Sequence, residues 1–382
     1  MHDLPATTLG TSTRPTIAEI DLRALSFNLK GIRRKVGKSV KIMAVVKANA
    51  YGHGLAEVSR FLARQSVEYL GVANAEEGVA IREAGIESPI LVFTLPAKAQ
   101  VHLYTQFRLE STICSEFDAR LLNTEATKRR LSLPVHLKVD TGMNRIGVKV
   151  PGIRKLLAFL SKLRRLEIKG IYTHFATADQ QDKTFSREQL DQFHQALDIL
   201  RSEGVSPEHI HCAGSAAIVD LPDSYFSMVR PGLMLYGYHP SRQMIETVQV
   251  KPVLALKSEV SLVKWIDPGE TVSYGRRYTA RRRTQIATLP LGYADGYMRL
   301  LTGKAEVLIN GRRFPIVGTI CMDQVMANVG DSDVAVGGEA VLIGTQGRES
   351  IDAWDLADRI GTIPYEVLTN ISSRVPRIYG KP

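Results

Sequence analysis

The segment KIMAVVKANAYGHG, residues 41–54, carries the strongest indication of the fold. Its first half is a continuous apolar run that ends in Lys47, and a polar loop containing glycines follows at once. Because the apolar residues of Ala44–Val46 are consecutive rather than alternating, the run is typical of a strand buried on both faces of a parallel sheet. A doubly wound open sheet is the alternative, but no G-x-G-x-x-G follows this strand. We therefore expect a barrel.

Seven more apolar runs follow this one and alternate with amphipathic stretches. The eight predicted strands are Lys41–Lys47, Tyr69–Ala73, Pro89–Thr94, Glu110–Cys114, Leu133–Asp140, Leu166–His174, His209–Ala213 and Ser227–Arg230. Helical patterns lie between most of them, at Leu55–Ser66, Ala75–Gly85, Ser115–Arg130, Gly152–Arg165 and Ser186–Gly204. The helical pattern is weakest after Thr94. Eight strands joined by crossovers within roughly 225 residues predict a (β/α)8 barrel.

The sequence pattern changes near Gln249. Lys251–Ile266 indicates a long strand region, and Asn310-Gly311 lies between two apolar runs as a strong hairpin signal. A short helix is expected at Ile351–Ile360. We therefore predict an α/β protein with a loose N-terminal tail over 1–15, a (β/α)8 barrel over 16–248 and a mainly β C-terminal domain over 249–382.

The composition is ordinary for a soluble globular protein, with 44% hydrophobic and 23% charged residues. The first fifteen residues carry no apolar core of a signal peptide, and no apolar stretch approaches membrane-spanning length, so we expect a cytoplasmic protein without membrane partners. Cys114, Cys212 and Cys321 show no metal-ligand spacing, so we expect reduced thiols and no metal. Because the net charge of +10 comes without a nucleic-acid-binding motif, it indicates anionic small ligands rather than nucleic acid.

The chemistry of a (β/α)8 barrel lies at the C-terminal ends of its strands. The residues at or just beyond these predicted ends are rich in cations and histidines, and they include Lys47, Lys138, Asp140, Arg145, His174, His211, Ser215 and Arg230. A lone lysine at a strand end is usually solvated. Beside other cations and away from water, however, Lys47 would have the lowered pKa that a Schiff-base lysine needs. The convergence of these residues favours the functional interpretation.

Two glycine-bearing loops follow the seventh and eighth predicted strands, where such barrels often bind phosphate. Ser215 and Gly232 in these loops suit close approach to a phosphate, and simple helix capping and turn formation stay the alternative. Arg230 could pair with a carboxylate structurally, or it could contact the pyridine nitrogen of pyridoxal phosphate (PLP). An arginine that stays protonated would leave the ring a weaker electron sink, which favours proton return over transamination.

Seven segments in this order carry a family resemblance: AVVKANAYGHG, KVDTGMNRIG, HCAGSAA, RPGLMLYGYHP, SYGRRYTA, LGYADGY and CMDQ. Together they resemble bacterial alanine racemases, from about Pro15 to the C-terminus. The resemblance implies a PLP-dependent isomerase of fold-type III that interconverts L- and D-alanine with two bases and supplies D-alanine for peptidoglycan. It also implies a homodimer whose active sites are shared between the subunits.

The resemblance further implies a role for individual residues. Lys47 would be the cofactor-linked lysine and one base, and Tyr274 of the other subunit would be the opposite base. PLP would be held by Lys47, Tyr51, His174, Ser215, Arg230, Gly232, Leu233 and Tyr365. The substrate carboxylate would meet Arg145 and Met322, with Lys138, His211 and Asp323 in supporting positions.

The sequence departs from the family pattern at two positions. Gly214 stands where asparagine is usual, and Phe93 stands where leucine is common. Neither replaces a base, so we expect retained activity with altered cofactor affinity or pocket shape. A preference for alanine over serine is left open.

Two other functions fit parts of this pattern. An amino-acid decarboxylase of the same layout would typically carry a glycine-triplet phosphate loop and a C-terminal catalytic cysteine, and neither is evident. A non-enzymatic PLP carrier built on a lone barrel would have no counterpart of residues 249–382.

Overall fold

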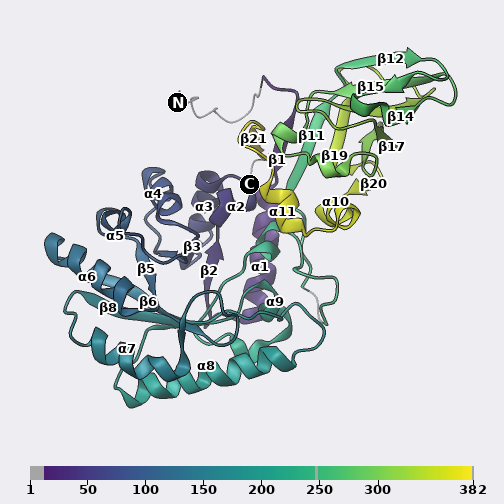
Figure 1. Ribbon diagram of the computed structural model, residues 1–382. Coiled ribbons are helices and arrows are strands. Elements are labelled where there is room, and N and C mark those ends of the chain that lie inside the picture. Colours follow the sequence, from purple (N-terminus) through teal and green to yellow (C-terminus); the bar gives the residue numbers. More distant parts are fainter. Residues whose placement is uncertain (1–12, 246–247, 381–382) are drawn as a thin grey trace. The chain divides into compact units, whose positions relative to one another are not determined.

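The computed structural model describes residues 13–245 and 248–380, which form two compact units (Figure 1). The barrel unit holds Ser26–Ala50 and Leu55–Lys251. The β-rich unit holds, within the described residues, 13–25, 51–54 and 252–380. Residues 1–12, most of the predicted loose tail, lie outside the described residues.

Eight parallel strands nearly close a barrel, as predicted. They follow the order β10-β2-β3-β4-β5-β6-β8-β9. The two ends of this order meet where the Arg230 amide donates to the Ala213 carbonyl at 2.8 Å and the Ser227 amide donates to the Ile210 carbonyl at 3.2 Å. The bounds are β2 Lys41–Val45, β3 Tyr69–Val72, β4 Ile90–Val92, β5 Glu110–Ile113, β6 Leu133–Asp140, β8 Leu166–Tyr172, β9 His209–His211 and β10 Met228–Val229.

Most residues of the barrel strands are buried, which explains the consecutive apolar residues of β2 and β4. Every residue of β3, β4 and β5 is buried. Inside the barrel, side chains from five strands form one packed layer, which consists of Met43, Tyr69, Leu91, Tyr172 and Met228. Such interior layers make the barrel a solid core, so ligands are left to its rim.

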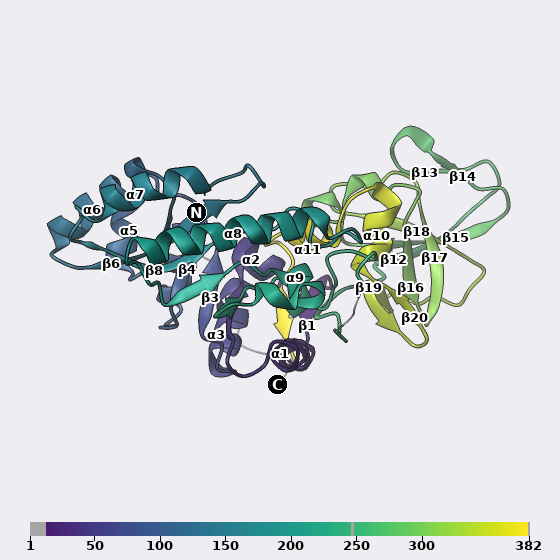
Figure 2. The same cartoon turned by 90° about the horizontal axis from the view of Figure 1, so that it is seen from below.

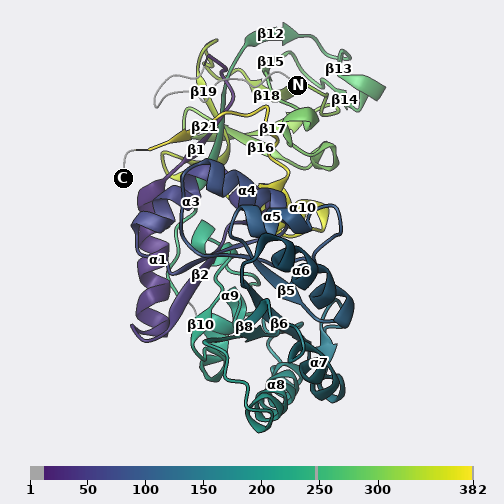
Figure 3. The same ribbon diagram turned by 90° about the vertical axis from the view of Figure 1, so that its left-hand side faces the viewer.

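Helices surround these strands, as Figure 3 shows. The bounds are α1 Leu22–Val36, α3 Leu55–Arg64, α4 Ala75–Glu83, α5 Val101–Gln106, α6 Glu116–Arg129, α7 Ile153–Leu160, α8 Thr184–Ser202 and α9 Ser215–Asp220. Helix α8 runs beside α7 (Figure 2). The six-residue α5 is the helix that follows Thr94, where the helical pattern is weakest.

The β-rich unit is built on a mainly antiparallel sheet, which confirms the predicted C-terminal architecture. Its strand order is β12-β15-β18-β17-β16-β19-β11-β1-β21, with β20 paired to β19. The bounds are β1 Ile17–Ile20, β11 Leu254–Glu259, β12 Leu262–Ile266, β15 Thr284–Leu289, β16 Glu306–Ile309, β17 Arg312–Val317, β18 Val325–Gly330, β19 Glu339–Gln346, β20 Glu349–Ile351 and β21 Arg377–Tyr379. A hairpin of β13 Thr271–Val272 and β14 Tyr278–Thr279 and the helices α10 Ala353–Ile360 and α11 Pro364–Thr369 complete it.

Two short segments expected within 16–248 group with the β-rich unit instead. Strand β1 pairs antiparallel with β11 and parallel with β21, so it is an integral part of the large sheet. Residues 51–54 also belong to this unit. Pairing between strands more than 230 residues apart leaves no periodic signal in the local sequence, which is why the pattern did not reveal it. The domain boundaries at 15 and 248 stay a prediction.

The turn between β16 and β17 is the predicted hairpin. Asn310 has φ 52° and Gly311 has φ 69°, so both residues are left-handed, as a type I′ turn requires. We expect Gly311→Ala to lower the free energy of unfolding by about 1–2 kcal/mol, because a Cβ disfavours left-handed backbone. Urea denaturation measures this loss. Gly380→Ala is the control, since that glycine is not left-handed and its Cβ would lie 3.8 Å from the Ile20 carbonyl oxygen, an ordinary van der Waals contact. Equal losses in both variants would contradict the prediction.

Candidate active site

Lys47 follows β2 at the C-terminal end of the barrel strands, where it was expected. Burial lowers its pKa, the nearby charge of Arg145 lowers the pKa further, and the carboxylate of Glu77 raises it. The lowered pKa enlarges the neutral fraction of the amine, which is the form that attacks an aldehyde. The local chemistry therefore suits a Schiff-base lysine.

Arg145 lies in the loop after β6, and Asp140 shapes this loop. The Asp140 carboxylate accepts hydrogen bonds from two backbone N–H groups of the loop, at 3.1 and 2.9 Å. A Cβ on Gly147 would lie 2.5 Å from the Asp140 nitrogen, so only glycine permits this turn. The charge of Arg145 lowers the pKa of both Lys47 and Lys138. These three cations therefore lie around one barrel mouth.

Lys138 is buried beside an aromatic ring. Its Nζ lies 5.2 Å from the centroid of the Tyr172 ring, and the Arg230 guanidinium carbon lies 5.3 Å from the same centroid. Tyr172 also stacks on His211, with 4.8 Å between the ring centroids. Burial and the charges of Arg230 and Arg145 lower the pKa of Lys138 to about 7. A large fraction of this amine is therefore neutral at neutral pH.

A chain of hydrogen bonds runs from Arg230 through the barrel interior. Arg230 Nη1 lies 2.8 Å from His211 Nδ1, His211 Nε2 lies 2.9 Å from His136 Nδ1, and His136 Nε2 lies 2.9 Å from Glu110 Oε2. Because a guanidinium has only donors, each imidazole must accept at Nδ1 and donate from Nε2. Lys169 Nζ donates to the other Glu110 oxygen at 2.8 Å. The chain therefore sets both tautomers.

Arg230 is fixed on its other side as well. Its Nη2 donates to the carbonyls of Thr173 and Cys212 at 2.8 and 3.0 Å and to His174 Nδ1 at 3.1 Å. Burial, together with the charge of Arg230, holds the pKa values of His174 and His211 well below their usual range. Arg230, with its pKa lowered to about 10, stays protonated at neutral pH beside two neutral imidazoles.

The residues expected at the phosphate fall into two groups. In the barrel unit, Ser215 Oγ accepts a hydrogen bond from the Gly232 amide at 2.9 Å, and Leu233 follows in the same buried loop. In the β-rich unit, the rings of Tyr51 and Tyr365 lie 5.9 Å apart between centroids. Within each unit, the residues expected at the phosphate therefore lie close to one another.

Tyr274 lies in the β-rich unit with 73% of its surface exposed. Its carbonyl accepts a hydrogen bond from Thr319 Oγ1 at 2.7 Å, and Ser273 Oγ donates to the Thr319 carbonyl at 2.6 Å. These bonds hold the backbone on both sides of the tyrosine. The ring borders a cavity of about 480 Å³ within this unit, which Cys321 also lines. The backbone at Tyr274 is thus anchored, while its phenol is exposed at the surface of this unit.

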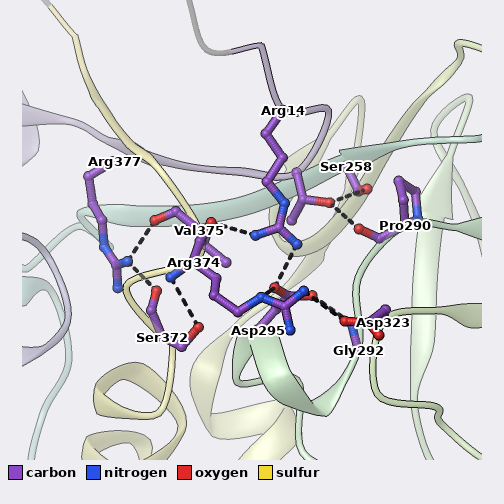
Figure 4. A network of polar contacts seen from close by, with 11 residues as sticks. Arg14, Ser258, Pro290, Gly292, Asp295, Asp323, Ser372, Arg374, Val375 and Arg377 are labelled. Atoms are coloured by element: carbon purple, nitrogen blue, oxygen red, sulfur yellow. Dashed lines mark hydrogen bonds and ion pairs between the residues drawn. The ribbon is translucent and has the colours of Figure 1, made fainter. Parts of the chain in front are cut away.

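The loop that carries Met322 and Asp323 is anchored by a charged network (Figure 4). Arg374 Nη2 lies 2.7 Å from the Asp323 carboxylate, and Arg14 Nη2 lies 2.6 Å from the buried Asp295 carboxylate. The Met322 carbonyl accepts from the amide of Ala294, next to Asp295, at 3.0 Å. Met322 itself is 52% exposed. The network therefore presents Met322 at the surface on a fixed backbone.

Three residues joined to this site by stacking or hydrogen bonds were not predicted from the sequence, namely Tyr172, His136 and Glu110. Side chains at alternate positions of a strand share a face. His136 is two residues before Lys138, and Tyr172 is two residues before His174, so alternation along the predicted strands could have found both. Glu110 begins β5, and no local pattern links it to the mouth.

The two departures from the family pattern have visible consequences. A Cβ on Gly214 would lie 3.1 Å from His174 Cε1, so a larger side chain there would press on that imidazole. Phe93 packs on the interior layer and lies over Gly71, where a Cβ would come within 2.5 Å of its ring. Gly71 therefore provides the space for the larger Phe93.

The buried histidines predict acid sensitivity. Burial lowers the pKa of His136, His174 and His211, and that of His209 to about 4. As the pH falls below about 6.5, the unfolded chain binds protons that the folded chain does not, so stability falls by up to about 1.4 kcal/mol per pH unit for each histidine. We expect the thermal midpoint to drop between about pH 7 and 5. His209→Gln should lessen this drop in the thermal midpoint, whereas His102→Gln, at an exposed position, should leave it unchanged. Equal effects of the two substitutions would contradict the view that buried histidines cause the acid sensitivity.

Comparison with known proteins covers almost the whole chain. The family models of the alanine racemase N-terminal and C-terminal domains match residues 20–240 and 253–379. The alanine racemase of Halothermothrix orenii is 46% identical over 371 residues, which are 96% of this chain and 97% of the relative.

Among residues 13–245 and 248–380, none of the helices combines the length and the apolar character that a membrane span requires.

Solved structures agree with this match. Alanine racemase from Bacillus anthracis with bound L-Ala-P aligns with a TM-score of 0.93 and 35% identity, over 97% of this chain and 96% of that chain. Histidine racemase from Leuconostoc mesenteroides subsp. sake aligns with a TM-score of 0.90 and 28% identity, over 98% and 100%. The chain therefore belongs to the alanine racemase family, whose members are PLP-dependent isomerases.

Proposed function

We propose that this chain is a PLP-dependent racemase that interconverts L-alanine and D-alanine and supplies D-alanine for peptidoglycan. The observation that carries the proposal is Lys47, an amine of lowered pKa at the rim of a barrel that belongs to the alanine racemase family. The relative from Bacillus anthracis with bound L-Ala-P supports a small amino acid as the substrate. Because the family models match both parts of the chain, a carrier built on a lone barrel has no support.

The barrel mouth fits PLP because the pKa values of Lys47 and Lys138 are lowered by burial and by the charge of Arg145, and an anionic phosphate or carboxylate would offset that excess positive charge. PLP, when bound, withdraws electrons from the substrate Cα and so makes its proton acidic. Between turnovers Lys47 would hold the cofactor through its aldehyde carbon, and Arg230, oriented by His174 and His211, would hold the pyridine nitrogen. Tyr51, Ser215, Gly232, Leu233 and Tyr365 would hold the phosphate.

Two side chains handle the proton. With its amine released by the incoming substrate amine, Lys47 Nζ would take the α-proton from one enantiomer and Tyr274 Oη would take it from the other. The base that did not take the proton would donate one to Cα from its own, opposite face. Arg145 and Met322 position the substrate carboxylate. Lys138 supports Arg145, and Asp323 holds the loop of Met322. This division of labour suits racemisation, which needs a base on each face of Cα.

Arg230 limits the competing reaction. Arg230 would donate a hydrogen bond to the ring nitrogen and keep its own proton at neutral pH, since its pKa is about 10. Burial keeps His174 and His211 neutral, so neither imidazole would supply a proton to that nitrogen. A ring that stays unprotonated would be a weaker electron sink, which favours return of a proton to Cα over transfer of the amino group.

The enzyme is a homodimer in which Tyr274 and Met322 complete the site of the partner subunit. The exposure of both side chains in the single chain supports this arrangement, because large apolar and aromatic groups at a surface often mark an interface. The three cysteines are free thiols, which fits a location in the reducing cytoplasm.

A racemase assay over a panel of L-amino acids tests the function. Purified chain with PLP is incubated with L-alanine, L-serine or L-histidine, the last because of the histidine racemase among the structural neighbours. Chiral chromatography is expected to show D-alanine formed fastest. Absence of interconversion with PLP bound would overturn the proposal, and carbon dioxide release from lysine, ornithine or diaminopimelate would favour a decarboxylase.

A further inference from the structure

A run of left-handed backbone follows Lys47. Ala48, Asn49, Ala50 and Tyr51 have φ values of 53–54°, and none of them is glycine. Each left-handed residue of this kind is disfavoured by its Cβ, so four in succession persist only where other contacts hold them. These residues follow Lys47 directly within α2 (Lys47–Tyr51), so their conformation sets the direction of the Lys47 backbone. Contacts that hold this turn therefore also position the Lys47 amine.

Glu77 makes the contact that reaches the turn from another part of the barrel. Its Oε1 accepts a hydrogen bond from the Ala48 amide at 2.6 Å, and its Oε2 accepts one from the Ala73 amide at 2.7 Å. One carboxylate thus joins the residue after Lys47 to the loop after β3. Two other hydrogen bonds of the turn are local, from the Leu55 amide to Asn49 Oδ1 and from the Ala50 amide to the Val46 carbonyl.

The helix that carries Glu77 is itself fixed at its start. The Glu77 amide donates to the side chain of Asn74, the N-cap of α4, at 2.9 Å. Its neighbour Glu76 is exposed and contacts Gln100 instead. Both acids lie in the first turn, where either complements the helix dipole. The dipole therefore does not explain why the Glu77 carboxylate turns away to two loop amides.

We propose that Glu77 is a positioning residue for Lys47: its carboxylate spans the Ala48 and Ala73 amides and holds the left-handed turn in the orientation that presents the amine to the cofactor. The inference rests on the proposed function of Lys47 and adds a residue to it. A carboxylate offers an acceptor oxygen to each amide. A glutamine offers only one, and its NH₂ group would face the second N–H.

Hydrogen exchange tests the clamp without any catalytic readout. Full-length wild-type protein, Glu77→Gln and Glu76→Gln are purified, freed of PLP and compared by mass spectrometry over the peptide containing residues 47–52. Glu77→Gln is expected to exchange these amides about 10- to 100-fold faster, as loss of a charge-assisted hydrogen bond implies, with Glu76→Gln unchanged. Wild-type exchange in Glu77→Gln would overturn the proposal.

Cofactor attachment and turnover supply the second readout. With PLP returned, Glu77→Gln is expected to attach PLP to Lys47 more slowly, as followed by borohydride trapping, and to lose kcat with little change in KM. Glu77→Asp keeps the charge but is one methylene shorter, so its rate of PLP attachment and its kcat should lie between those of Glu77→Gln and wild type. This variant replaces Glu77→Gln in the test if Glu77→Gln does not fold. Wild-type behaviour of both variants would overturn the clamp. If wild type shows no racemase activity while the exchange contrast persists, the proposed function fails and the clamp stands.

Discussion

Replacement of Lys47 by alanine is expected to abolish interconversion of L- and D-alanine, with a loss of at least about 10⁴-fold in kcat. The variant lacks both the amine that holds the cofactor aldehyde and the base on one face of Cα. Chiral chromatography measures the rate, and borohydride reduction followed by peptide mass analysis locates the attached cofactor. In wild type the label is expected on Lys47.

Lys41→Ala is the matched control, because Lys41 begins the same strand β2. Its amine is paired with the Glu208 carboxylate at 2.8 Å, at the opposite end of the strand from Lys47. We expect this variant to keep racemase activity within a few-fold. Racemisation by Lys47→Ala, or a borohydride label on a different lysine of the wild-type protein, would contradict the mechanism.

Tyr274→Phe is expected to lower racemisation in both directions by about 10²- to 10⁴-fold, the usual effect of losing a general acid–base group. The substitution removes only the hydroxyl. Each complete turnover needs a proton on both faces of Cα, so the loss of one base blocks both directions. Lys47 nevertheless remains, and exchange of the α-hydrogen with deuterium oxide should persist for one enantiomer only. Proton magnetic resonance measures that exchange.

Tyr278→Phe controls for the loss of a phenol in the same unit. Its hydroxyl accepts a hydrogen bond from Asn328 Nδ2 at 2.8 Å and takes no part in the proposed chemistry. We expect near-normal turnover from this variant. If Tyr274→Phe lost exchange equally for both enantiomers, Tyr274 would be a substrate-holding group rather than a base.

Most of the fold could be predicted because the relevant signals are local. Consecutive apolar residues at 42–45 mark burial of β2 on both faces, and Asn310-Gly311 marks a hairpin through its left-handed backbone. Strand β1 escaped prediction because its partners lie in β11 and β21, far along the chain. The region Lys251–Ile266 forms two strands, because its hydrogen-bonding partner changes at Val260–Ser261. The Val260 amide donates to the Gly338 carbonyl, next to β19, whereas the Ser261 amide donates to the Thr288 carbonyl of β15.

Local sequence is enough to place cations and histidines at the ends of the barrel strands, and these groups converge because the C-terminal ends of parallel strands meet at one rim. How the groups are held follows from contacts that exist only in the folded chain. The tautomers of His136 and His211 depend on Arg230 and Glu110 at the two ends of one hydrogen-bonded chain. The turn after Lys47 depends on the Glu77 carboxylate, 29 residues away. Periodicity reports which face of an element is buried, whereas hydrogen bonds between distant segments form only when the folded chain brings them together.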